Sequence, residues 1–258
     1  EEAVRRIKAE TVSDRLPEGL GITLCVGEQT RETYARWYAA GAHRYLLRIE
    51  TTSPSLFATL HPPWQKLKNR IAALRTLREL GYQVGTGVMI GLPGQTTEDL
   101  ANDIQFFRDI DVDMIGMGPY IVHKDTPMAG HQAVMDARRE ETYQLALRMI
   151  AVTRLALRDV NIAATTALQA MKPNGREEGL RYGANIIMPQ LTPTEVRRNY
   201  QLYEGKPCLD ENKEQCMHCL AGRVRSVGRV VGLDGWGDSR HFATRHAVNR
   251  ACVRLKTP

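Results

Sequence analysis

Short apolar runs rich in β-branched residues alternate with longer segments of helical pattern from Leu20 onward. This alternation is typical of βα units built around a parallel sheet. The sequence therefore predicts an α/β fold. Six strands are expected, over residues 21–26, 43–50, 83–92, 112–118, 161–166 and 185–188.

Helices are expected between these strands, and the helix after the third strand has the clearest beginning. Thr96 and Thr97 can cap its N-terminus, and Glu98 and Asp99 in its first turn suit the helix dipole. The expected helices cover residues 31–40, 67–80, 96–107 and 137–158, with a short one near 177–180 and an amphipathic one over 1–10.

The alternation alone fits two arrangements, a (βα) barrel and an open doubly wound sheet. The barrel is the favoured interpretation. In either arrangement, functional residues belong at the carboxyl ends of the strands. That rule selects Thr23, Cys25, Arg48, Glu50, Met89, Gly116, Gly118, Thr165, Thr166 and Met188.

Composition narrows the class of protein. The chain has 258 residues, of which 43% are hydrophobic and 25% charged, enough for one substantial core. The formal charge is +6, but the basic residues are scattered apart from a modest concentration over 223–254, so no nucleic-acid partner is expected. The sequence has neither a long apolar run nor a signal-peptide layout, which predicts a cytoplasmic protein without a membrane partner.

Three of the five cysteines lie within twelve residues, in the pattern Cys208-x7-Cys216-x2-Cys219. We expect this pattern in a polar loop after the last strand. Clustered thiols in a reducing compartment favour metal ligation over disulfides or incidental thiols. Spacing alone leaves open an iron-sulfur cluster or a zinc ion with a fourth ligand such as His218.

Charged and hydroxyl side chains at strand ends form a second candidate site. Arg48 and Glu50 lie on one face of the second strand, where they could bind a ligand or form a structural ion pair. Arg70 in the following helix could join them or be a surface residue. The glycine-rich stretch 85–96 lacks the Lys-Ser/Thr ending of a phosphate loop, so its glycines are expected to serve tight turns or close backbone approach.

Several segments carry a resemblance to a known family. Residues 44–51 and 88–96 resemble radical S-adenosylmethionine (SAM) enzymes of the biotin synthase group. Residues 161–167, 183–189 and 200–203, together with the three-cysteine pattern, resemble the HydE family of FeFe-hydrogenase maturases within that group. The resemblance runs from about residue 20 to residue 219.

The resemblance implies a TIM-type (βα)8 barrel of which this chain supplies strands three to eight. It implies a partial barrel over residues 1–206 and a C-terminal iron-sulfur loop and tail over 207–258, packed on the barrel. The Cys-x3-Cys-x2-Cys pattern that binds the SAM-cleaving 4Fe-4S cluster in such enzymes does not occur here. We therefore expect the chain to be part of a longer enzyme and inactive by itself, rather than a barrel that has lost its chemistry.

Carried over position by position, the resemblance implies three groups of site residues. SAM would be bound by Cys25, where relatives commonly have Ser, by Glu50 through the ribose hydroxyls, and by Arg70 through the methionyl carboxylate. The accessory iron-sulfur cluster would be bound by Cys208, Cys216 and Cys219. A small cysteine-derived iron complex would be the substrate, lined by Arg44, Arg48, Thr165, Thr166, Met188 and Tyr200.

The implied cofactors are thus SAM, a 4Fe-4S cluster with ligands outside this chain, and an accessory iron-sulfur cluster. The resemblance also implies other hydrogenase maturation proteins as partners.

Three alternative functions stay open. One is another biotin synthase-like or methylornithine synthase-like enzyme, and the second is a non-catalytic iron-sulfur or zinc module. The third, a basic RNA-associated protein, would lose affinity at high salt.

Overall fold

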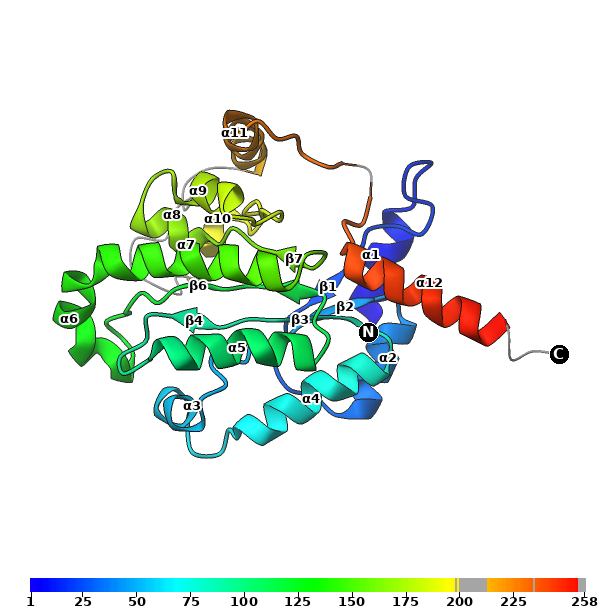
Figure 1. Cartoon of the computed structure of the whole chain (residues 1–258). Coiled ribbons are helices and arrows are strands. Elements are labelled where there is room, and N and C mark those ends of the chain that lie inside the picture. Colours follow the sequence, from blue (N-terminus) through cyan, green and yellow to red (C-terminus); the bar gives the residue numbers. More distant parts are fainter. Residues whose placement is uncertain (198, 200–212, 234, 255–258) are drawn as a thin grey trace.

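The computed structural model describes residues 1–197, 199, 213–233 and 235–254. Its sheet is parallel, with the strand order β1-β2-β3-β5-β7, and a two-stranded extension pairs β4 with β6 (Figure 1). The strands are β1 (Thr23–Leu24), β2 (Arg44–Leu46), β3 (Gln83–Thr86), β4 (Met89–Ile90), β5 (Met114–Ile115), β6 (Gly118–Pro119) and β7 (Asn161–Ile162).

Helices follow the strands as the sequence predicts, with additional short ones. The helices expected over 31–40, 67–80, 96–107 and 137–158 are present with slightly shifted ends. The helices are α1 (Glu2–Glu10), α2 (Arg31–Ala39), α3 (Pro54–Leu60), α4 (Leu67–Glu79), α5 (Thr97–Asp109), η1 (Pro127–His131), α6 (Gln132–Ala137), α7 (Arg139–Ala156), α8 (Thr166–Met171), α9 (Gly175–Arg181), α10 (Thr194–Arg197), α11 (Lys213–Ser226) and α12 (Arg240–Arg254).

The strand order distinguishes the two arrangements that the sequence left open. In the five-stranded sheet, each strand pairs with the strand of that sheet that comes next in the chain. A bridge between Ala163 and Ile186 adds the sixth predicted strand at the end of the series. A doubly wound sheet would reverse direction partway through this order, whereas a barrel is wound in one direction. The winding is therefore that of a barrel. Within the described part of the chain, no ladder joins β1 to the Ile186 segment.

The third and fourth predicted strands are each interrupted, which corrects the expectation of continuous strands over 83–92 and 112–118. Gly87 lies at the break, where a Cβ atom would lie 1.8 Å from the carbonyl oxygen of Gly116. The Arg48 guanidinium donates hydrogen bonds to the carbonyl oxygens of Gly116 and Val88. Because these oxygens accept from a side chain, the regular ladder gives way to β4 and β6 beyond this point.

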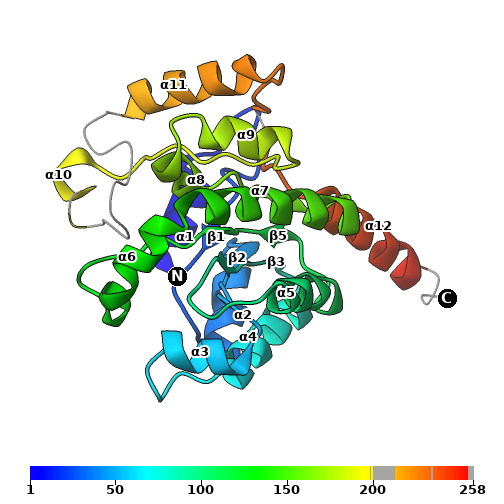
Figure 2. The ribbon, with the colours of Figure 1, turned by 60° about the vertical axis from the view of Figure 1, so that its left-hand side comes forward.

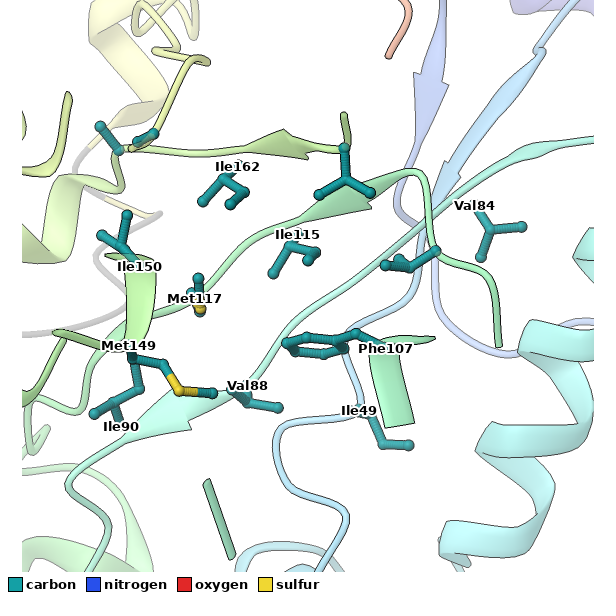
Figure 3. Packing of buried hydrophobic residues seen from close by; sticks show 14 of the residues in the cluster. Ile49, Val84, Val88, Ile90, Phe107, Ile115, Met117, Met149, Ile150 and Ile162 are labelled. Atoms are coloured by element: carbon teal, nitrogen blue, oxygen red, sulfur yellow. The ribbon is translucent and has the colours of Figure 1, made fainter. Parts of the chain in front are cut away.

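The core lies between the sheet and its covering helices. Ile49, Val84, Ile115 and Ile162 come from the strand segments and belong to the same buried cluster as Phe107 of α5 (Figure 3). Helices α5 and α7 lie beside the sheet in both views (Figures 1 and 2). Burial of this continuous apolar cluster is the main stabilising contribution to such a fold.

Helix α5 begins where the sequence predicts. Thr96 is its N-cap, and its hydroxyl accepts from the backbone N–H of Asp99 at 3.1 Å. The Asp99 carboxylate in turn accepts from the Thr96 N–H at 2.8 Å, which completes a capping box and lowers the pKa of Asp99. Gly91 and Gly94 before the helix have φ angles of 85° and 78°, so the tight-turn interpretation of these two glycines is confirmed.

The segment before α12 covers the amino ends of the strands. The Asp238 carboxylate accepts from Gln83 Nε2 at 2.7 Å and lies 3.0 Å from His43 Nε2. The Asn161 side chain donates to the carbonyl oxygen of Gly237 at 2.9 Å. Figure 1 shows α12 and α1 together at this end of the sheet, opposite the carboxyl ends where functional residues were expected.

Helix α11 covers the other side of the molecule, over α9 (Figure 2). Arg223 forms an ion pair with Glu177 at 2.8 Å, and Val224 belongs to the main core. The described parts of the C-terminal region therefore contact the barrel at two places. The domain boundary predicted at residue 206 stays a prediction. Among the described residues, no helix combines the length and apolar character that crossing a bilayer requires.

Candidate functional site at the carboxyl ends of the strands

An ion pair between Arg48 and Glu50 lies at the centre of the candidate site. Arg48 Nε donates to Glu50 Oε1 at 2.9 Å, and Arg48 Nη2 donates to Glu50 Oε2 at 2.9 Å. The two side chains are 28% and 19% exposed, so the pair is partly shielded but open to a ligand. Burial disfavours the charged guanidinium, yet the Glu50 carboxylate outweighs this effect and raises the pKa of Arg48.

Most of the donor capacity of Arg48 is already in use. Beyond Glu50, its Nη1 donates to the Gly116 carbonyl and its Nη2 also donates to the Val88 carbonyl at 3.0 Å. A guanidinium has five N–H groups, so one Nη1 hydrogen is left for a ligand. Arg48 therefore has a structural role, because it connects Glu50 to the backbone of Val88 and Gly116 at the break in the sheet.

Arg70 of α4 joins this site. Its Nη1 donates to the main-chain carbonyl of Arg48 at 2.9 Å, which fixes it beside the end of β2. Its Nε donates to the Glu28 carboxylate at 2.8 Å, and its Nη2 donates to Gln65 Oε1 at 3.3 Å. The guanidinium of Arg70 is thus oriented toward a carboxylate, the group that a planar donor fork binds best.

Cys25 and His61 lie near the charged cluster. Burial raises the pKa of the Cys25 thiol; the Arg48 charge lowers this pKa and the Glu50 charge raises it, both to a smaller extent. His61 stacks on Phe57 with 3.9 Å between ring centroids, and its Nδ1 lies 3.0 Å from the Phe57 carbonyl oxygen. Burial is the main cause that lowers the pKa of His61. A neutral imidazole that donates from Nδ1 has Nε2 as an acceptor.

The predicted hydroxyl residues lie at the same end of the sheet. Thr165 is the N-cap residue of α8, and a Cβ atom at Gly118 would lie 2.4 Å from its Oγ1. This hydroxyl oxygen is buried and has no hydrogen-bond partner among the described residues. Thr166 is the first residue of α8. Met188 follows the Ile186 bridge; its carbonyl oxygen accepts from Arg176 at 3.4 Å, and 59% of the residue is exposed.

Arg44 is separated from this group, contrary to the expectation that it would lie with Arg48 on the substrate side. It lies at the beginning of β2, at the amino ends of the strands. Its guanidinium donates to the Trp236 carbonyl and lies 3.4 Å from the Asp238 carboxylate. The reason is the strand rise, since four residues along an extended strand separate two side chains by about 13 Å.

The three predicted cluster ligands are described only in part. Cys208 and Tyr200 lie outside the described residues. Cys216 and Cys219 lie on α11, so the expectation of a polar loop is wrong for these two residues. Cys216 is buried and its sulfur accepts from the Gln190 N–H at 3.2 Å. Among the described residues, no three His, Cys, Asp or Glu side chains are grouped so as to hold a metal ion.

Sequence reasoning missed three residues of this site: Glu28, His61 and Asp103. Glu28 lies just beyond the end of the first strand, so the strand-end rule could have included it. Asp103 of α5 is buried and bonds the loop after Glu50. Its signal was a carboxylate on the same helix face as Leu100 and Phe107. His61 gave no signal beyond its residue type.

No model of a protein family matches the chain. The fold is similar to the crystal structure of methylornithine synthase (PylB), with a TM-score of 0.71 over 96% of this chain and 65% of that one, at 22% identity. At this identity the likeness shows the fold alone: a parallel sheet with covering helices, in the winding of a barrel.

Two curated relatives extend the comparison to sequence. The chain is 45% identical over 239 residues to the [FeFe] hydrogenase maturase subunit HydE of Thermotoga maritima, which covers 91% of this chain and 66% of that protein. It is 30% identical to biotin synthase 1 of Corynebacterium diphtheriae, over 73% of this chain and 49% of that protein. The chain belongs to the radical SAM enzymes of the HydE and biotin synthase group. It spans less than two thirds of the length of these relatives.

Proposed function

We propose that this chain forms the SAM-binding and substrate-binding part of a radical SAM maturase for the FeFe-hydrogenase. The observation that carries the proposal is the cluster of Arg48, Glu50 and Arg70 at one rim of the sheet, linked through hydrogen bonds of 2.9 Å. The 45% identity to a HydE protein gives this cluster its chemical interpretation. A rim of this kind is where a barrel binds its ligands.

The residues fit the polar ends of SAM. The Glu50 carboxylate uses part of its acceptor capacity on Arg48, which leaves lone pairs for the two ribose hydroxyls. Arg70 already binds the carboxylate of Glu28, so a methionyl carboxylate would take over these donors without new desolvation of the guanidinium. Cys25 lies close enough for Arg48 and Glu50 to affect the pKa of its thiol.

When bound beside a reduced 4Fe-4S cluster, SAM supplies radical chemistry to such enzymes. The Cys-x3-Cys-x2-Cys ligands for that cluster do not occur in this sequence, so the complete reaction belongs to the proposal for the whole protein. This chain contributes binding, orientation and exclusion of water from the barrel interior.

The proposed substrate is a small cysteine-derived iron complex, and Thr165 is the strongest candidate to bind it. Its buried Oγ1 has no partner among the described residues, so a ligand carboxylate would supply the missing hydrogen bond. Arg48 could add one N–H, while Thr166, Met188 and Tyr200 stay predictions. Arg44 would not contribute, because the segment before α12 occupies its guanidinium.

Cys216 and Cys219 fit two positions of the proposed accessory iron-sulfur cluster. They are three residues apart on α11 and therefore share a helix face. The Gln190 N–H stabilises negative charge on the Cys216 sulfur, as hydrogen bonds to cluster thiolates do. Anaerobic reconstitution with iron and sulfide should give iron binding that Cys216→Ser lowers by half or more and Cys25→Ser leaves unchanged. Equal iron content in both variants would exclude this assignment.

Calorimetric titration with S-adenosylhomocysteine tests the main proposal, because this ligand shares the ribose and amino-acid groups of SAM. We expect binding by this chain and a loss of roughly tenfold or more in Arg70→Ala, the usual effect of removing a charged hydrogen bond. Arg75→Ala, an exposed arginine on the same helix, is the matched control and should bind like the unmodified chain. Absence of binding, or equal losses in both variants, would overturn the proposal.

A further inference from the structure

Asp103 is a buried carboxylate inside the apolar face of α5. It is 0% exposed and shares this face with Leu100 and Phe107, which are also buried. Burial raises its pKa to about 6. An apolar side chain would suit such a position better, because an ionised carboxylate away from water is destabilising unless it is well bonded.

Among the described residues, the hydrogen bonds of Asp103 go to one residue of the loop after β2. Its Oδ1 accepts from the Thr52 N–H at 2.8 Å and from the Thr52 hydroxyl at 2.7 Å. Its Oδ2 is buried without a hydrogen-bond partner among the described residues. The Asp103 carboxylate therefore binds Thr52 through two hydrogen bonds, one from its backbone N–H and one from its hydroxyl.

Thr52 lies two residues after Glu50, whose backbone is unusual. Glu50 has a φ angle of 65°, in the left-handed region that costs a non-glycine residue about 1–2 kcal/mol. Its N–H donates to the Gly87 carbonyl at 2.9 Å, and its carbonyl accepts from the Met89 N–H at 2.9 Å. Such a conformation persists only where neighbouring contacts fix the chain on both sides.

The two sides of Glu50 are fixed differently. Before it, β2 belongs to the sheet, and the Ile49 N–H donates to the Thr86 hydroxyl at 3.2 Å. After it, the chain leaves the sheet, and the Thr52 bonds to Asp103 are the nearest side-chain anchor to another helix. The Glu50 carboxylate extends from this left-handed position, and the Thr52 bonds fix the chain two residues beyond it.

We propose that Asp103 is a positioning residue that, through Thr52, holds the Glu50 carboxylate in the orientation needed to accept the ribose hydroxyls of an adenosyl ligand. This inference rests on the proposed function, since it deepens the role of Glu50 in that site. Asp103 does not touch the ligand. Its effect is on how strongly Glu50 distinguishes a ribose from a sugar that lacks a hydroxyl.

The test compares S-adenosylhomocysteine with its 2′-deoxyribose analogue by calorimetric titration. The unmodified chain should prefer the ribose form by roughly tenfold, the effect of one hydrogen bond to a charged group. Asp103→Leu should lower this preference to about twofold or less while changing the affinity for the deoxy analogue little. Asp103→Asn keeps an oxygen for both Thr52 donors, so it should retain most of the preference. Asp109→Leu, on the exposed face of the same helix, is the matched control.

Each outcome has a separate meaning. An unmodified chain that binds neither ligand, or binds both equally, contradicts the proposed function. A chain that discriminates in the unmodified form and equally well in Asp103→Leu contradicts this inference alone. If Asp103→Leu does not fold, Thr52→Val decides, because it removes the hydroxyl bond at constant shape and should lower the preference about threefold. A Thr52→Val variant with full preference would then overturn the inference.

Discussion

The guanidinium of Arg70 donates a hydrogen bond of 2.9 Å to the main-chain carbonyl of Arg48. Helix α4, the second helix after β2, thereby bonds the backbone just beyond the end of that strand. This contact aligns Arg70 with the Arg48–Glu50 pair independently of any ligand. A site preorganised in this way spends less binding free energy on ordering its side chains.

Glu28 should compete with a ligand carboxylate for Arg70. Since the carboxylate lies 2.8 Å from Arg70 Nε, Glu28→Gln should free the guanidinium and tighten S-adenosylhomocysteine binding by roughly threefold to tenfold. Titration calorimetry measures the change, with exposed Glu32→Gln on α2 as the control. Weaker binding in Glu28→Gln would mean that Glu28 contacts the ligand directly.

Asp103 should make stability depend on pH. Its pKa in the folded protein is raised from 3.8 to about 6, so the folded state holds the proton more tightly than the unfolded chain does. The stabilising contribution is complete below pH 3.8 and is lost as the pH rises through about 6. The shift corresponds to about 3 kcal/mol.

Denaturant unfolding of the unmodified chain and of Asp103→Asn at several pH values isolates this effect, since other groups cancel in the difference. The free energy of unfolding of Asp103→Asn, relative to the unmodified chain, should rise by about 2–3 kcal/mol between roughly pH 4 and pH 7. A constant difference over this range would show that Asp103 is ionised throughout.

Gly87 should tolerate no side chain. A Cβ atom there would lie 1.8 Å from the Gly116 carbonyl oxygen and 3.1 Å from Arg48 Nη1, so backbone must move. Gly87→Ala should lower the free energy of unfolding by about 3 kcal/mol or more. Gly222→Ala on α11 is the matched control, because a Cβ atom added there has no neighbouring atom within 4 Å. Alanine is also more favourable than glycine in a helix, by about 0.5–1 kcal/mol. Equal stability of the two variants would contradict the close approach.

Arg154 should be a stability residue rather than a site residue. Its guanidinium donates to the carbonyls of Gly183, Arg158 and Val160 at 2.8–2.9 Å, and to Asn185 Oδ1 at 2.9 Å. Arg154→Ala should cost about 3 kcal/mol, because it leaves part-buried carbonyl oxygens unpaired. The midpoint temperature of thermal unfolding should fall by roughly 6–12 °C. The exposed Arg148→Ala on α7 should shift it little, and a similar small shift in Arg154→Ala would refute this role.

The sheet could be predicted from the sequence because its signals are local. Apolar runs such as 161–166 and the Thr96 cap depend on neighbours in the chain, so six strands and the α5 start follow from them. The interruption at Gly87 could not be predicted. It depends on Arg48 reaching across to Gly116 and Val88, a contact between residues far apart in sequence.

The candidate site was predictable where strand ends define it and not where helices supply partners. Arg48, Glu50 and Arg70 were found, but Asp103 bonds the site from α5 and has no motif of its own. Cys216 shows the opposite case. Its cysteine spacing suggested a loop, although the surrounding residues of α11 include good helix formers such as Leu220 and Ala221.

The segment before α12 also bears on how the chain reaches its native state. Asp238 meets His43 across 195 residues of sequence, and Gly237 meets Asn161 across 76. During synthesis, the amino ends of the strands must therefore stay uncovered until almost the whole of this sequence has left the ribosome. Contacts of such long separation slow folding, so the nascent sheet spends that interval exposed to aggregation and to chaperones.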